Sequence, residues 1–486
     1  MDRKWRALIV VCVGVFMLLL DITVVNVALP DIQRELHASF TDLEWVVDAY
    51  ALMLASVMLN AGTLGDMLGR KRVFVAGVAL FTIASALCGA ATSPLFLNLA
   101  RGAQGIGGAI MFAVSLAILS QEFHGRERGT AFGIWGASVG AAIAIGPLVG
   151  GALTTWLGWR WIFFINLPIG VLCVVGAIRE LHESRNEEHG GFDLPGFATL
   201  TSGLFALVLA LLRGNDWGWG SGREVALYVA AVVLLSAFAL IELRRSDPTL
   251  DFALFRIPTF SGAQIVAFTL SASIFSQFLY LTLYLQNVLG YSPIQAGLRF
   301  LPLSVVSFFI APIAGRLSAL LPVKLLLGLG LALIGVALLL MHGVTAHSGW
   351  TALLPGFIVA GIGVGMVNAP LASTAVSVVE PRRAGMASGL NSTFRQVGIA
   401  TGIAGLGAIF QNRIQSELHG TGATKVVSSG VVQGSEIARA AFISGLDEIL
   451  LVGAIVAFVG AGLAFVLVRR RDFVPSGPAG SGVATE

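Results

Sequence analysis

The stretch that decides the fold is Gly62-Thr-Leu-Gly-Asp66-Met-Leu-Gly69-Arg70-Lys71-Arg72, which lies between two long apolar runs. One acidic and three consecutive basic residues would be costly within a lipid bilayer, so the chain is expected to leave the membrane here. The glycines permit a tight reversal, and a basic cluster is typical of the cytoplasmic end of membrane-spanning helices. The stretch therefore predicts a cytoplasmic turn between two such helices.

Composition predicts an all-α polytopic membrane protein that needs the lipid bilayer as its surroundings. Of the 486 residues, 56% are hydrophobic and only 12% are charged, which is unlike a soluble protein of this length. The charges cluster between apolar runs of about 20 residues, the length a helix needs to cross the hydrocarbon core. The net charge of +3 is spread over many loops, which argues against nucleic acid as a partner.

The apolar runs predict about fourteen membrane-spanning helices. Basic residues gather on the same side at every turn if the N-terminus is inside, so both termini are expected in the cytoplasm and the protein in the cytoplasmic (inner) membrane. The expected spans are 6–29, 44–64, 73–92, 95–119, 130–157, 161–180, 195–212, 224–243, 261–285, 294–316, 323–342, 351–377, 386–410 and 447–468.

The spans divide as six, two and six. We expect an N-terminal six-helix half over 1–185, two inserted transmembrane helices with linkers over 186–256, a C-terminal six-helix half over 257–472, and a disordered cytoplasmic tail over 473–486. Pro312-Ile-Ala-Gly315-Arg316 is a weak copy of the opening stretch, as expected of related halves. The long outer connection, 411–446, is expected to be a solvated loop or a cap on the outer face.

Asp21 is the first charge inside a span and the first candidate for a proton-carrying site. A carboxylate at that depth costs at least ~2.5 kcal/mol on insertion scales, so it is expected to face the bundle interior. Burial favours the protonated form, which suits a group that gains and loses a proton. A structural hydrogen bond between helices is the alternative, and Asp48 is a second candidate carrier that could instead be in contact with water.

Arg101 is the second intramembrane charge, at a depth similar to that of Asp21 from the outer side. The two side chains could therefore form a pair. Gln104, Gly105 and Gly108 follow at helical spacing and share the face of Arg101, where small residues let another helix or a ligand approach.

Small residues also form a stripe in the fifth span. The stripe predicts close approach of two helices, and the proline a bend; helix packing alone would also explain the glycines. Its main members are Gly136, Gly140, Gly146, Pro147, Gly150 and Gly151.

Further polar residues inside spans predict a substrate cavity. Arg395 could meet an anionic substrate or neutralise a carboxylate, and structural pairing is equally compatible with its position. The candidates for the cavity are Asn26, Gln104, Gln277, Asn368 and Arg395. The histidines show no metal-ligand spacing, so no metal site is expected.

Several of these stretches resemble a known family. The opening stretch is similar to the loop between helices 2 and 3 of the major facilitator superfamily and matches it at Gly62, Leu64, Asp66, Gly69, Arg70 and Lys71. Met67 departs from that pattern, where the family usually has a basic residue. The resemblance implies a cytoplasmic gate formed by this loop, closed when the transporter faces outward.

Four further stretches also resemble members of this superfamily. Leu20 to Pro30 resembles the first-helix signature of the fourteen-helix drug:proton antiporters. Arg101 to Gly108 resembles their fourth-helix motif, in which the arginine is tied to proton transfer, and Asn391 to Gly398 resembles a segment of the same proteins. Gly136 to Gly151 resembles a fifth-helix motif that accompanies exporters rather than importers.

The residues and the resemblance together predict a proton-coupled multidrug efflux antiporter of the major facilitator fold, with a role in antibiotic resistance. Its substrates are expected to be lipophilic, often cationic small molecules. No phosphate-binding loop of the G-x-x-x-x-G-K-[ST] type occurs, so ATP is not expected as the energy source. No enzyme activity and no cofactor beyond the coupling proton are expected, and the protein is expected to be a monomer. The alternatives are a dedicated exporter of one metabolite, such as an antibiotic, siderophore or lipid-like molecule, an importer, and a membrane sensor that does not transport.

Overall fold

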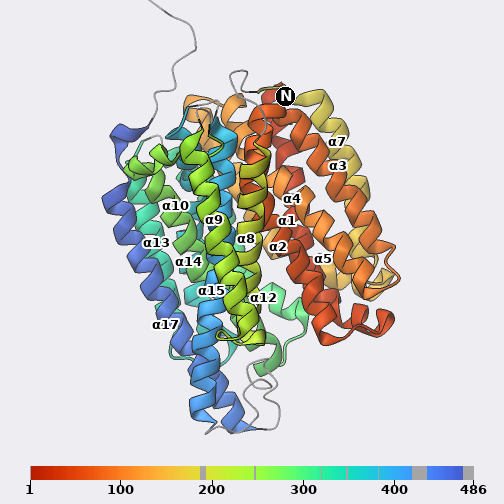
Figure 1. Ribbon diagram of the computed structural model, residues 1–486. Coiled ribbons are helices and arrows are strands. Elements are labelled where there is room, and N and C mark those ends of the chain that lie inside the picture. Colours follow the sequence, from red (N-terminus) through yellow and green to blue (C-terminus); the bar gives the residue numbers. More distant parts are fainter. Residues whose placement is uncertain are drawn as a thin grey trace, which may run out of the picture.

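The computed structural model describes residues 2–185, 193–245, 248–318, 320–345, 348–380, 383–418 and 435–473. These residues form a bundle of long helices that run side by side, with no strand in the described part (Figure 1). Twelve helical segments of the described residues are long and apolar enough to cross a membrane. Two more long helices, α5 and α15, lie in the same bundle. The predicted all-α membrane fold is confirmed.

The first part of the chain forms seven helices, which we call the N-terminal half. Ser93 and Pro94 begin one of them, since the Ser93 hydroxyl accepts from the backbone N–H of Phe96. Gly69 has φ of +106° and joins two helices through a single residue, a conformation that L side chains rarely adopt. The helices are α1 Arg3–Leu36, α2 Phe40–Leu68, α3 Arg70–Gly89, α4 Pro94–Glu122, α5 Gly125–Leu157, α6 Trp161–Phe164 and α7 Asn166–Glu180.

Two helices follow, which we call the inserted pair: α8 Leu194–Trp217 and α9 Gly222–Arg244. The remaining elements form the C-terminal half, in which one crossing combines α-helical and π-helical turns between Pro258 and Val288. The elements are η1 Phe252–Arg256, α10 Pro258–Leu270, η2 Ser271–Phe275, α11 Ser276–Leu283, η3 Tyr284–Val288, α12 Pro293–Leu317, α13 Val323–Met341, η4 Trp350–Leu353, α14 Leu354–Ser377, α15 Ala384–Glu417, α17 Glu436–Leu467 and η6 Arg470–Asp472.

Each half has an apolar core of its own. One large buried cluster joins α10 through α17. Another joins α1 through α5 and α7, and it is met at one edge by Ala372 and Val376 of α14 and Ala384 of α15. The halves meet along two lines, α2 against α15 and α5 against α12. An arrangement of two cores joined along two lines is compatible with movement of the halves relative to each other.

The inserted pair covers one of these two lines. Helix α8 packs against both α2 and α15, and α9 packs on the outside of α8 (Figure 1). A small apolar cluster joins α2, α8 and α15. It contains Leu52 and Ala55 from α2, Val208 from α8 and Ala400 from α15. The pair is therefore part of the bundle rather than an appendage.

Two expectations about helix ends were wrong. Helix α1 continues to Leu36 instead of ending near residue 29, with Pro30 accommodated inside it. Both described ends of the expected outer connection, 411–446, are helical, because α15 continues to Glu417 and α17 begins at Glu436. Arg413 pairs with Glu417 and Glu448 across these extensions, so polar contacts continue both helices beyond the apolar part of the sequence. Residues 419–434 and all but the first residue of the expected tail lie outside the described residues.

Candidate functional site

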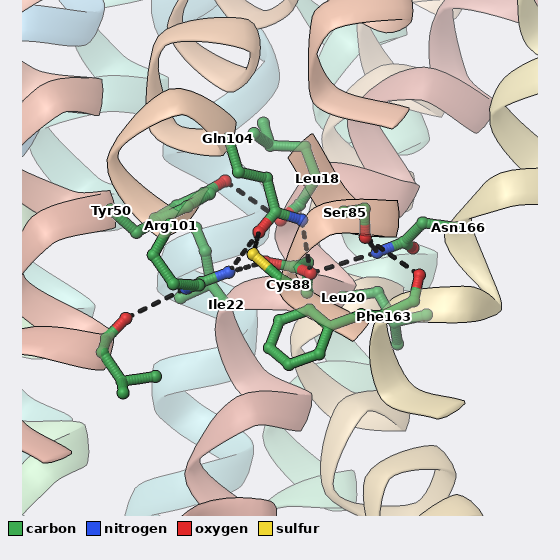
Figure 2. A network of polar contacts seen from close by, with 12 residues as sticks. Leu18, Leu20, Ile22, Tyr50, Ser85, Cys88, Arg101, Gln104, Phe163 and Asn166 are labelled. Atoms are coloured by element: carbon green, nitrogen blue, oxygen red, sulfur yellow. Dashed lines mark hydrogen bonds and ion pairs between the residues drawn. The ribbon is translucent and has the colours of Figure 1, made fainter. Parts of the chain in front are cut away.

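Arg101, Gln104 and Asn166 belong to one buried polar network (Figure 2), and Asp21 is the partner that all three share. Its side chain is 1% exposed and forms an ion pair with Arg101 of α4, with 2.5 Å between Oδ2 and Nη1. The second carboxylate oxygen, Oδ1, accepts from Gln104 Nε2 at 2.9 Å and from Asn166 Nδ2 at 3.1 Å. Sequence analysis placed Asp21, Arg101 and Gln104 as candidates, and the structure brings these three together.

Arg101 has further partners that hold it in place without Asp21. Its Nε donates to the carbonyl of Val46 on α2 at 2.9 Å, and Nη1 donates to Gln104 Oε1 at 2.7 Å. The guanidinium carbon lies 4.3 Å from the centre of the Tyr50 ring, a cation–π contact. The arginine therefore stays anchored when the charge of the carboxylate changes.

Asn166 and Ser85 were missed by the sequence reasoning. Asn166 begins α7, and its Nδ2 also donates to Ser85 Oγ of α3 at 3.0 Å. Ser85 in turn donates to the carbonyl of Phe163 at 2.9 Å. The available signal was a lone amide in the apolar run Phe163-Phe-Ile-Asn-Leu-Pro, but its partner could not be read from spacing.

The network is costly, which points to function. Two charges lose their hydration on burial, and their mutual attraction roughly offsets that loss, so a buried ion pair contributes little net stability. Ionisable groups held inside a membrane protein therefore mark ion or substrate pathways by default. Asp21 and Arg101 are such a pair, on adjacent helices that belong to the same half.

The opening stretch of the sequence forms a second polar site, between the two halves. Asp66, at the end of α2, pairs with Arg70 at 2.7 Å between Oδ1 and Nη2, and both side chains are buried. Its two oxygens also accept backbone N–H bonds from the first turn of α15, from Gly385 at 3.0 Å and Met386 at 2.9 Å. A carboxylate is favoured there because a helix N-terminus carries unpaired N–H groups and a partial positive charge.

Glycines let the backbones of the two halves touch beside this site. A Cβ on Gly62 would clash with the carbonyl oxygen of Gly385, and a Cβ on Gly129 of α5 would clash with that of Gly315 of α12. Gly315 belongs to the weak copy of the opening stretch, so the copy also lies on a line between the halves. We call the end of the bundle that holds Arg70 and Arg316 the basic end; both glycine contacts are there.

The remaining predicted gate residues lie in the N-terminal half. Gly69 joins α2 and α3, as described above. Lys71 donates through Nζ to the carbonyl of Ile178 on α7 at 2.6 Å, and its backbone N–H donates to Glu183. These contacts hold α3 to α7 and to the segment after it, within one half.

The glycine stripe of α5 faces two neighbours. Gly136 and Gly140 lie towards the C-terminal half, where a Cβ would come within 3.8 Å of Asn368 and 3.9 Å of Ser307, respectively. Gly146 and Gly150 instead meet Thr23 and Val24 of α1, and Gly151 meets Ile294 of α12. Pro147 lies within α5, and its side chain is outside the described part.

The predicted cavity residues do not form one group. Arg395 donates through Nη1 to Asn368 Oδ1 at 2.9 Å, which links α15 to α14. Gln277 is buried and donates to the carbonyl of Ile449 on α17 at 2.6 Å, within the C-terminal half. Asn26 is exposed, and its amide donates to the carbonyl of Ile22 one turn back. Gln104 belongs to the Asp21 network.

Asp48 has a partner that sequence reasoning missed. Arg213 of α8, buried to 3% side-chain exposure, lies 2.9 Å from Asp48 Oδ2 and 2.6 Å from Glu44 Oε2, both on α2. Its guanidinium carbon lies 4.7 Å from the centre of the Trp45 ring. The inserted pair is thus fastened to the N-terminal half near the end opposite the basic end.

Replacing Arg213 by methionine is expected to lower the free energy of unfolding by about 1–3 kcal/mol. Removing one partner of a fully buried pair costs ~3–5 kcal/mol, and Glu44 and Asp48 are partly exposed here. Thermal unfolding in detergent measures the change. Combining Arg213→Met with Asp48→Asn should recover part of the lost stability, because one unpaired carboxylate is removed. An unchanged melting temperature in Arg213→Met would show that the ion pairs of Arg213 do not stabilise the protein.

The comparison with known proteins gives the family. Residues 11–403 match the model of the Major Facilitator Superfamily. The chain belongs to this superfamily. The multidrug resistance protein Stp of Mycobacterium tuberculosis is 38% identical, over 83% of this chain and 75% of that protein. The tetracenomycin C resistance and export protein of Streptomyces glaucescens is 33% identical, over 97% of this chain and 92% of that protein.

A third relative and a solved structure agree with this placement. The puromycin resistance protein pur8 of Streptomyces alboniger is 37% identical, over 94% of this chain and 91% of that protein. The crystal structure of the human organic anion transporter MFSD10 (TETRAN) matches with a TM-score of 0.67 over 96% of this chain and 100% of that one; at 15% identity it shows the fold alone. The prediction of a multi-pass facilitator of the drug-efflux type, not an enzyme, is confirmed at family level.

Proposed function

We propose that this facilitator exports lipophilic drugs from the cytoplasm in exchange for protons, with Asp21 as the proton carrier. The observation that carries the proposal is the buried pair of Asp21 and Arg101, the one ion pair of the described residues whose two side chains are each only 1% exposed. A titratable carboxylate in that setting has two states that differ strongly in their interactions. Proton binding there can therefore drive a change of conformation.

The coupling step follows from the contacts of the network. When Asp21 is ionised, it accepts from Arg101, Gln104 and Asn166. A proton arriving on one of its oxygens removes the ion pair, while Arg101 stays bound to the Val46 carbonyl and to Gln104. The protonated side chain thus loosens α1 from α4. Movement between these two helices would be passed to the rest of the N-terminal half.

The gate at the basic end provides the second part of the cycle. Positively charged loops face the cytoplasm in membrane proteins, so we place the basic end and both termini inside the cell. Asp66, bound to the first turn of α15, would hold that side closed while the transporter is open to the outside. These bonds have to break in each cycle to admit the next substrate molecule.

One proton per cycle is sufficient for efflux. A membrane potential of about 100 mV contributes ~2.3 kcal/mol per charge, and one pH unit adds ~1.4 kcal/mol. For an uncharged substrate the two terms together sustain a gradient of a few hundredfold, at ~1.4 kcal/mol per tenfold; exchange of one proton for a monovalent cation moves no net charge, so the pH term alone sustains about tenfold. The account is complete with a single functional chain, so we propose that the monomer transports.

Ethidium uptake into inverted membrane vesicles tests the proposal. An inward-acid pH gradient should drive uptake into vesicles that contain the parent protein, and adding ethidium should partly dissipate the gradient. Nigericin, which collapses the pH gradient, should stop the uptake. Uptake that continues after nigericin, with the membrane potential also collapsed, would contradict proton coupling.

A dedicated exporter of one metabolite is the second candidate. Two relatives carry single compounds in their names, tetracenomycin C and puromycin. Overexpression in a drug-sensitive bacterium separates the two functions. Resistance to several unrelated lipophilic compounds supports multidrug export, and resistance confined to one compound supports the dedicated exporter.

A further inference from the structure

Arg395 of α15 is a half-buried cation without a carboxylate partner in the described part of the chain. It lies eleven residues after Ala384, the first residue of α15, which places it about 16 Å along the helix at ~1.5 Å per residue. Its Nη1 donates to Asn368, whereas Nη2 is shielded from solvent and has no hydrogen-bond partner. The side chain as a whole is partly exposed.

This arrangement differs from that of the three arginines that are buried in the described residues. Arg70 pairs with Asp66, Arg101 with Asp21, and Arg213 with Glu44 and Asp48. The sequence offers Arg395 no equivalent partner. From Phe252 to Ser416 it contains a single acidic residue, Glu380. Glu380 lies between the end of α14 and the start of α15, at the basic end. Two acids of α17 have other partners, since Asp447 accepts from the backbone N–H of Gly343 and Glu448 pairs with Arg413. No ion pair of the described residues therefore involves Arg395.

Arg395 also lies towards the line where the halves meet. Its partner Asn368 is on α14, and a Cβ built on Gly136 of α5 would be 3.8 Å from the Cβ of Asn368. Helix α15 itself contacts α2 and α4 of the N-terminal half. A substrate that passes between the halves would therefore pass this guanidinium.

We propose that Arg395 binds an acidic group of the transported molecule, and that the substrates include lipophilic compounds with a carboxylate or sulfonate. The inference rests on the proposed function, since it names a substrate class for the same transporter. An anionic oxygen would give the unused Nη2 donor a charge-assisted hydrogen bond and neutralise a charge that no side chain neutralises. Asn368 is a positioning residue, because its amide oxygen orients the guanidinium.

The carboxylates of the bundle support this class. A preference for cationic compounds, as expected from the sequence, requires a carboxylate that is free to attract them. In this conformation Asp21, Asp48 and Asp66 each pair with an arginine. The uncompensated charge near the line between the halves is thus positive.

Binding of two matched probes tests the proposal. 4-(1-Pyrenyl)butyrate and 4-(1-pyrenyl)butyltrimethylammonium share their apolar body and carry opposite charges. Their dissociation constants are measured by fluorescence on the purified full-length protein. The parent should bind the butyrate at least tenfold more tightly than the ammonium probe.

Variants of two arginines on α15 decide whether Arg395 is responsible. Arg395→Gln should lower the ratio of the two affinities at least tenfold, and Arg395→Lys, which keeps the charge, should retain most of it. Arg413→Gln removes a positive charge from the exposed extension of the same helix and should leave the ratio unchanged. A structural role for Arg395 would weaken both probes together and preserve the ratio.

The results separate this inference from the proposed function. No preference for the butyrate in the parent, or a preference that survives in Arg395→Gln, overturns the anion site even if ethidium transport is proton-coupled. A preference that disappears in Arg395→Gln establishes the site even if ethidium transport does not depend on protons.

Discussion

Replacing Asp21 by asparagine is expected to reduce drug uptake driven by a pH gradient at least a hundredfold in inverted vesicles. Asparagine fits the same space and can accept from Arg101, so the fold should be retained, but it cannot bind and release a proton. Ethidium exchange without any gradient should therefore continue at a measurable rate, because exchange requires binding and movement but no net proton transfer.

Two further variants control this prediction. Asp31→Asn changes an aspartate near the end of the same helix, which pairs with Arg34 at the surface, and should leave gradient-driven uptake intact. Asp48→Asn removes the alternative proton carrier. It should lower the melting temperature, because Arg213 loses a charge partner, and it should leave uptake driven by the pH gradient largely intact. If Asp48→Asn abolishes coupling and Asp21→Asn does not, the proton carrier is Asp48.

Asp66→Asn is expected to reduce transport at least tenfold while the protein is still produced and inserted. The carboxylate accepts two hydrogen bonds from the guanidinium of Arg70 and two from the backbone of α15. Asparagine offers one oxygen acceptor, and its NH2 group would face an N–H donor of α15. Arg70, buried between the halves, would lose its charge partner, which is costly.

The matched control is Asp42→Asn on the same helix, α2. Asp42 is in an exposed capping box with Ser39 at the opposite end of the helix, so its loss should cost about 1 kcal/mol of stability and little transport. Both variants are compared for ethidium uptake at equal amounts of inserted protein. Uptake by Asp66→Asn equal to that of the parent would remove Asp66 from the gate.

The helix count and the main polar site were predictable because the membrane makes charge informative. Asp21 and Arg101 are costly inside apolar runs, so their positions alone marked them, and Gln104 followed from its spacing on the face of Arg101. In the same way the charged stretch around Asp66 marked a turn. These predictions use the cost of placing a charge in an apolar span, which can be judged for each helix separately.

The partners of these residues were not predictable, because they depend on how helices pack. Asn166 reaches Asp21 since α7 lies against α1, and a lone amide in an apolar run does not reveal this. Arg213 lies on the inserted pair, far in sequence from Asp48. The acceptor role of Asp66 involves backbone N–H groups of α15, which have no side-chain signal at all.

The extensions of α15 and α17 show a second limit of prediction from the sequence, which concerns helix ends. The region 411–446 is poor in apolar runs, so hydropathy predicted a loop there. In the structure, both helices continue beyond the expected span ends. Arg413 of α15 pairs there with Glu417 of the same helix and with Glu448 of α17. Pairs of this kind stabilise exposed helices modestly, and their partners are visible only once the two helices are known to be neighbours.

Proton release on drug binding is the most direct test of Asp21 as the carrier. Purified parent and Asp21→Asn protein are placed in weakly buffered detergent solution with a pH indicator, and a saturating amount of a transported drug is added. We predict that the parent releases up to one proton per molecule when the drug is added at a pH acidic enough for the carrier to be protonated beforehand, and that Asp21→Asn releases none. Equal proton release from both proteins would contradict the account.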